Sequence, residues 1–151
     1  MKKLTFVALI TTFALAQGCA MERSTAKIQG DTRPCVTNYS AEGDMWKGKH
    51  FKTYEEFSNV SKTDAFEKTA AAIASSGFQI TSSNKDLGII SASQAVSYSS
   101  GGKSVPFNAV VTSTAGGKVR VGLSFTLSGG LVTSADGIQE EFCQVLESVS
   151  H

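Results

Sequence analysis

Residues 105–127 read VPFNAVVTSTAGGKVRVGLSFTL and carry the clearest periodic pattern in the chain. In both halves of this stretch, apolar side chains alternate with polar or small ones, as in strands that bury one face. Gly116-Gly117 lies between the halves and predicts a tight hairpin, because glycine adopts positive φ without a steric cost. The alternating apolar positions are Val105, Phe107, Ala109, Val111, Val119, Val121, Leu123, Phe125 and Leu127. We therefore expect an antiparallel sheet with one buried face.

Two helices are expected, one on each side of this hairpin along the chain. Ser61-Lys62-Thr63-Asp64 is a capping-box pattern, and the helix that it starts is predicted to run to about Ser76, followed by Gly77. A second helix is predicted from Ser134–Asp136 onward, because apolar residues then recur every three or four positions. These residues are Ile138, Phe142, Val145 and Val149.

Three further strands complete the expected sheet. Lys49–Phe57 precedes the first helix, whereas Phe78–Thr81 and Ile89–Val96 follow it and are separated by a turn at Asn84–Gly88. The predicted order is strand, helix, four antiparallel strands, helix. A single alternating apolar set per strand implies one core face, so both helices are expected to pack on that face. Residues 49–151 are thus predicted to form a single α+β domain whose other sheet face is open.

Ala65–Ala92 reads AFEKTAAAIASSGFQITSSNKDLGIISA and resembles a segment found in small bacterial lipoproteins. Those proteins have a helix-grip or TBP-like domain and are similar to the accessory lipoprotein of the outer-membrane barrel assembly machine. The shared features are a helix ending at Gly77-Phe78, the Asp86-Leu87-Gly88 turn and the strand at Ile89–Ala92. The resemblance implies helices on a curved antiparallel sheet. Because these are turn and core residues, it implies no site, and a role in barrel assembly is not carried over to a chain with one such domain.

The first eighteen residues have the pattern of a secretory signal peptide. Two lysines precede the apolar run Leu4–Ala16, which is too short to cross a hydrocarbon core about 30 Å thick. Gly18-Cys19 resembles the lipobox of bacterial lipoproteins, and this implies that Cys19 is lipidated and anchors the protein to a membrane. By the same resemblance, Ala20 implies the outer membrane, with the domain facing the periplasm. The alternative is ordinary cleavage after Ala16, which would leave a soluble periplasmic protein.

Residues 19–48 show neither helical nor strand periodicity, so they are interpreted as a flexible tether. The chain has 14 basic and 13 acidic side chains, a balance that provides no electrostatic footprint for nucleic acid. Without the two leader lysines, 12 basic and 13 acidic side chains remain. The expected membrane contact is therefore the lipid alone, with no nucleic acid or nucleotide partner.

Two cysteines remain beside Cys19, namely Cys35 and Cys143. In an oxidising periplasm they are expected to form a disulfide that closes a loop of about 108 residues. The alternative is a pair of free thiols. A metal site is not expected, because no second Cys or His lies at ligand spacing from either residue.

No catalytic constellation is evident in the sequence. The histidines are His50, in a predicted strand, and His151, at the end of the chain. Ser99–Ser104 ends like a phosphate-binding loop but lacks its first glycine and precedes a strand rather than a helix. We therefore expect neither an enzyme nor a cofactor.

The expected function is that of a non-catalytic binding or adaptor domain with an envelope protein as partner. Trp46 is expected to staple the tether to the core, or alternatively to anchor a partner. Tyr54 and Lys52 are expected on the open sheet face. The alternative function is that of an inhibitor or immunity-type lipoprotein, acting on an envelope hydrolase through the loop at Ser97–Ser104. The candidate contact residues are Trp46, Lys52, Tyr54, Gly101, Gly102 and Lys103.

Overall fold

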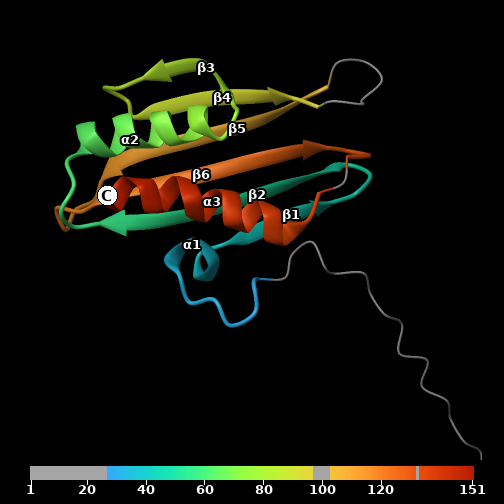
Figure 1. Cartoon of the computed structure of the whole chain (residues 1–151), viewed down its shortest axis with the longest axis horizontal. Coiled ribbons are helices and arrows are strands. Elements are labelled where there is room, and N and C mark those ends of the chain that lie inside the picture. The colour runs from blue at the N-terminus through green and yellow to red at the C-terminus, as the bar shows by residue number, and fades with distance from the viewer. Residues whose placement is uncertain (1–26, 97–102, 132) are drawn as a thin grey trace, which may run out of the picture.

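The computed structural model describes residues 27–96, 103–131 and 133–151, which form an α+β fold (Figure 1). Six strands make one antiparallel sheet, and three helices accompany it. None of these helices, among the residues described, is long and apolar enough to cross a membrane. The elements are α1 (Pro34–Thr37), β1 (Ser40–Asp44), β2 (Gly48–Phe57), α2 (Lys62–Ser75), β3 (Gln79–Asn84), β4 (Ile89–Ala95), β5 (Ser104–Ser113), β6 (Val119–Ser128) and α3 (Ala135–Ser150).

The sheet has the strand order β1-β2-β6-β5-β4-β3, so the two halves of the chain meet where the second strand of the sheet, β2, lies beside the third, β6. There β2 pairs with β6 over ten residues, from Gly48 opposite Ser128 to Phe57 opposite Val119. Helices α2 and α3 lie side by side on one face of the sheet, and α1 lies beside α3 next to β2 (Figure 1). The predicted order of strand, helix, four antiparallel strands and helix is confirmed and corresponds to β2 through α3.

The core lies between the sheet and the two long helices and is rich in aromatic rings. Phe107 is fully buried, and its ring centroid lies 4.9 Å from that of Phe78 and 5.8 Å from that of Phe142. All four predicted inward positions of β5 are buried, as are four of the five in β6; Phe125 is only partly buried. The apolar stripe predicted for α3 is also buried. The alternation along the strands therefore identified the core face correctly.

The interpretation of residues 19–48 as a flexible tether needs correction for its described part. Pro34–Thr37 forms α1 and Ser40–Asp44 forms β1, and Cys35, Val36 and Tyr39 belong to the hydrophobic core. Strand β1 is an edge strand with no fully buried residue, so the apolar alternation that marks a strand is missing from it. Residues 19–26 lie outside the described part of the chain. The folded domain thus begins well before residue 49.

The predicted turn at Asp86-Leu87-Gly88 is present and explains why glycine ends it. Gly88 has φ +74°, and a Cβ atom there would lie 2.0 Å from the carbonyl oxygen of Val111. The Val111 amide donates to the Gly88 carbonyl oxygen at 2.7 Å, so the turn is bonded directly to β5. A side chain at position 88 would push this contact apart.

Candidate functional site

The sheet face opposite the helices carries the candidate binding surface. Inward-pointing residues of β2, such as Phe51 and Thr53, are buried under the helices, whereas Lys52 and Tyr54 point to the other face and are exposed. The structure therefore places Lys52 and Tyr54 together on the open face, as expected. Whether they contact a partner remains a prediction.

Exposed apolar side chains form a row across this open face, which we call the transverse row. Strand register places Tyr54 opposite Gly122, Gly122 opposite Val110, and Val110 opposite Ile89. Tyr54, Val110 and Ile89 are 38%, 44% and 41% exposed, respectively. Gly122 carries no side chain, so bare backbone lies between Tyr54 and Val110. Beyond Ile89, the β3–β4 turn adds Leu87, which is exposed as well.

Charged side chains flank the transverse row at the Tyr54 end and are paired with one another. The Arg120 guanidinium lies 4.5 Å from the centroid of the Tyr54 ring and is 2.6 Å from the Glu56 carboxylate. On the other side of Tyr54, Lys52 and Glu42 form an ion pair at 3.6 Å. Two cations thus face two anions on this part of the sheet. Such a surface suits a neutral, partly apolar partner better than a strongly charged one.

The β1–β2 hairpin presents a second group of exposed apolar side chains at its tip, residues 44–48. Trp46 is 87% exposed and Met45 is 44% exposed. The Asp44 carboxylate accepts hydrogen bonds from the amides of Trp46 and Lys47 at 2.8 and 2.9 Å, so the turn has a defined shape. The expectation that Trp46 staples the N-terminal segment to the core is therefore wrong. Instead, the turn places this ring in solvent, which the sequence pattern did not indicate.

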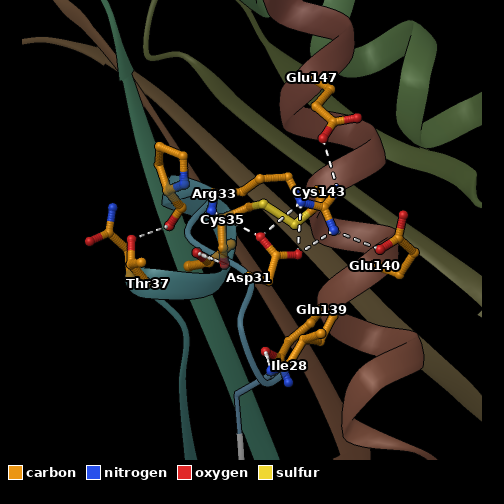
Figure 2. Close-up of a disulfide and its surroundings, with 12 residues drawn as sticks. Ile28, Asp31, Arg33, Cys35, Thr37, Gln139, Glu140, Cys143 and Glu147 are labelled. Carbon is orange, nitrogen blue, oxygen red and sulfur yellow. Dashed lines mark hydrogen bonds and ion pairs between the residues drawn. A yellow bond between two sulfur atoms is a disulfide. The ribbon is translucent and has the colours of Figure 1, made fainter.

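The N-terminal segment is instead held by a disulfide and by its polar surroundings (Figure 2). Cys35 and Cys143 are bonded across a sequence separation of 108 residues, with their Cα atoms 5.2 Å apart. The disulfide predicted from the sequence is therefore present in the structure. Next to it, Arg33 forms ion pairs of 2.7 to 2.9 Å with Asp31 in the same segment and with Glu140 and Glu147 of α3.

Two carboxyl groups near this disulfide have pKa values that are shifted in opposite directions. Hydrogen bonds from the side chain and the backbone amide of Arg33 hold the pKa of Asp31 below its ordinary value. The pKa of Glu55 is raised, first because the group is partly buried and second because the charge of Glu147 lies nearby. The cation at Arg33 thus stabilises one carboxylate, while Glu55 has no comparable stabilisation of its charge.

A shallow groove of about 540 Å³ runs between α2 and α3 on the helical side of the domain. One wall consists of Lys68 and small residues of α2 and the turn after it, and the other wall consists mostly of polar residues of α3. Among the described residues, the Oε1 atom of Glu141 is buried without a hydrogen-bond partner. The sequence gives no clear signal for this groove, because Ala and Ser at helical spacing indicate close packing as readily as a cavity. Its lining includes Lys68, Ala72, Ser75, Glu141, Gln144 and Ser148.

Three of the other predicted site residues lie outside the described residues, namely Cys19, Gly101 and Gly102. Lys103 is described and exposed at the start of β5, at the sheet end opposite the β5–β6 hairpin. Of the six candidate contact residues, the structure thus describes four, and these do not all lie on one surface. It brings Lys52 and Tyr54 together and places Trp46 at the hairpin tip.

The described residues include no group of three or more His, Cys, Asp and Glu side chains that could hold a metal ion. His50, on the open face, has its Nδ1 atom 3.1 Å from the Thr126 hydroxyl oxygen. No protein-family model matches the chain, and no curated protein matches it.

Proposed function

We propose that this protein is a lipid-anchored, non-catalytic domain of the bacterial envelope that binds a protein partner through the open face of its sheet. The observation that carries the proposal is the transverse row, in which Tyr54, Val110 and Ile89 are exposed in register on adjacent and near-adjacent strands. Apolar residues that line up across a rigid sheet form a surface whose burial against a partner is favourable.

Two features support a place outside the cytoplasm. The disulfide between Cys35 and Cys143 suits an oxidising compartment, since such bonds are rare in proteins kept in a reducing one. The leader with Gly18-Cys19 resembles a lipobox, and acyl chains on Cys19 would hold the domain at a membrane surface. The outer membrane remains the proposed destination, with the domain in the periplasm.

The charges on the open face support a protein partner of mixed character. Arg120 is paired with Glu56 and packs over Tyr54, so the row ends in an aromatic ring with a cation above it. Tyr and Arg are enriched in the central parts of protein interfaces. The loop invoked for the inhibitor alternative lies mostly outside the described residues, and no observation favours that function over an adaptor.

The proposal is tested by photo-crosslinking in intact cells, with the crosslinking residue placed at position 110 in the transverse row. The matched control is position 71, where Ala71 is exposed on α2 at the helical side of the domain. We expect a discrete crosslinked species from position 110 that is absent from position 71. Crosslinks from position 71 alone would place the binding surface on the helices and contradict the proposal.

A substitution provides an independent readout of the same surface. Val110→Lys introduces a charge at a position that is already 44% exposed, so the fold should tolerate it. We expect the complex with the captured partner to be lost while the melting temperature stays within a few degrees of the original. An unchanged complex would exclude the transverse row as the contact. Mass spectrometry of the mature N-terminus tests the anchor separately, since acylation adds a defined mass to Cys19.

A further inference from the structure

We propose that the β1–β2 hairpin tip, formed by Met45, Trp46 and Lys47, is a second membrane contact that sits in the headgroup region of the bilayer to which Cys19 tethers the domain. This inference depends on the lipid anchor of the proposed function. It revises the expectation that the lipid alone touches the membrane. It also assigns the hairpin tip and the open sheet face to different ligands.

Backbone hydrogen bonds hold the hairpin tip in one conformation. The Met45 carbonyl oxygen accepts a hydrogen bond from the Gly130 amide at 2.9 Å, so the turn is bonded to the segment after β6. A Cβ atom at Gly129 would lie 2.1 Å from the Trp46 carbonyl oxygen, which shows how closely the two backbones approach. Together with the Asp44 carboxylate, these contacts hold the backbone while the Trp46 and Met45 side chains stay exposed. An indole held out in this way loses little conformational freedom when it is buried in another phase.

The N-terminal segment enters the domain beside the first part of α3. The Ile28 amide donates to Oε1 of the buried Gln139, close to the start of α3 (Figure 2). Helix α3 begins at Ala135, a few residues after Gly130, which is bonded to the hairpin. Figure 1 shows the β1–β2 hairpin and the first turn of α3 toward the same end of the sheet. The N-terminal entry therefore lies near the beginning of α3, in the part of the domain that points toward the hairpin tip.

Only a short stretch of chain separates the proposed anchor at Cys19 from the start of the described domain at Lys27. Cys19 and Lys27 are eight residues apart. At about 3.3–3.6 Å per residue, even a fully extended chain spans at most about 29 Å. Strand β2 alone, with ten residues, is about 33 Å long. A lipid on Cys19 therefore keeps Lys27 within about 29 Å of the bilayer, so the part of the domain that carries the hairpin tip can reach the membrane surface.

The side chains of the tip are of types that favour the membrane interface. Tryptophan favours the membrane interface because its ring is apolar and its N–H group can stay hydrated. Met45 adds apolar area, and Lys47 extends an apolar stem with an ammonium group that matches anionic lipid headgroups. The Asp44 carboxylate in the same turn accepts hydrogen bonds from the backbone amides of Trp46 and Lys47. These residue types at the anchored end point to a lipid surface.

The test uses the fluorescence of Trp46, which is the only tryptophan in the chain. The acylated mature protein is reconstituted into phosphatidylethanolamine–phosphatidylglycerol vesicles, with and without bromine on the lipid acyl chains as a quencher. We expect blue-shifted Trp46 emission on the vesicles and loss of most of that emission when the lipids are brominated. The Cys19→Ala protein in buffer supplies the reference spectrum of an exposed ring.

A matched control moves the tryptophan to the open sheet face through the pair Trp46→Phe and Tyr54→Trp. In this variant brominated lipids should leave the emission unchanged, because position 54 lies in the transverse row. If Trp46 of the acylated, vesicle-bound protein has the spectrum of the buffer reference and is not quenched, the tip does not touch the membrane and the inference fails. A mature protein without acyl groups, shown by mass spectrometry, would instead overturn the anchor and the inference together.

Discussion

Removing the disulfide is expected to cost this domain a large part of its stability. In the double variant Cys35→Ala/Cys143→Ala, a crosslink between residues separated by 108 positions is lost. In the chain-entropy model, a closed loop of this length stabilises the folded state by about 4.8 kcal/mol, because it restricts the unfolded chain. A domain of ordinary stability unfolds at a cost of about 5–15 kcal/mol, so a third or more would be lost.

The remaining contacts of the N-terminal segment offset little of this loss. The Arg33 side chain is 34% exposed, and ion pairs of such groups contribute little in water. The buried hydrogen bond from the Thr53 hydroxyl to the Cys35 carbonyl oxygen, at 2.7 Å, stabilises by about 1 kcal/mol. Replacing two buried sulfur atoms with hydrogen adds a small packing cost in the same direction. We therefore expect a net loss of about 4–5 kcal/mol.

The assay is equilibrium urea unfolding of the oxidised protein and of the double variant, followed by circular dichroism. We expect a lower midpoint and a slope that is equal or slightly steeper, because the unfolded chain without the crosslink exposes more surface. As a control, the original protein is incubated with reductant under native conditions. Both sulfur atoms are buried there, so the folded protein should protect the disulfide from reduction. A difference in unfolding free energy below about 1 kcal/mol would refute the reasoning that the crosslink acts through the long loop that it closes.

Two other sets of substitutions test the turns and the electrostatics. Gly88→Ala and Gly117→Ala both place a side chain at a φ near +74°, but only position 88 would bring the new Cβ atom within 2.0 Å of the Val111 carbonyl oxygen. Thermal or urea unfolding should therefore show a loss of about 1–2 kcal/mol for Gly117→Ala and about 3 kcal/mol or more for Gly88→Ala; equal losses would contradict the steric explanation. The pKa of Glu55 is raised in the folded state by burial and by Glu147. Ionisation of this group therefore destabilises the folded domain, and the loss is complete once the pH has risen through the folded pKa. Glu55→Gln should consequently raise the melting temperature at pH 7 and have a much smaller effect near pH 4, and a pH-independent difference would argue against this origin.

Local sequence patterns were sufficient for most of the sheet and both long helices. Ser61 and Ser134 cap α2 and α3 with their side-chain oxygens, as Ser residues before apolar helical stripes suggest. Strand β1 was missed for a physical reason: an edge strand that buries almost nothing needs no apolar alternation. Val36 and Tyr39 are core residues in a segment whose composition is polar, so the composition did not indicate that they are buried.

The candidate surface was only partly predictable. Tyr54 followed from alternation in a strand that was already recognised. Val110 and Ile89 each stand next to another apolar residue, at Val111 and Ile90. Two adjacent apolar residues in a strand must point to opposite faces, so these pairs already contained a signal for an apolar patch on the open side. Only the strand order shows that these residues lie next to one another on the open face.

By itself, the sequence determined which strand residues point inward and where the two long helices begin, and it predicted the disulfide between Cys35 and Cys143. These properties depend on neighbours within a few positions, because side-chain periodicity and helix capping are local effects. Only the tertiary structure decided that β2 lies beside β6, which sets Tyr54, Val110 and Ile89 in one line. It also decided that Ile28, near the chain entry, lies beside the first part of α3, which points toward the same end of the sheet as the Trp46 hairpin. Both outcomes follow from strand pairings between residues far apart in the chain, whose register depends on how the entire apolar face packs against the helices.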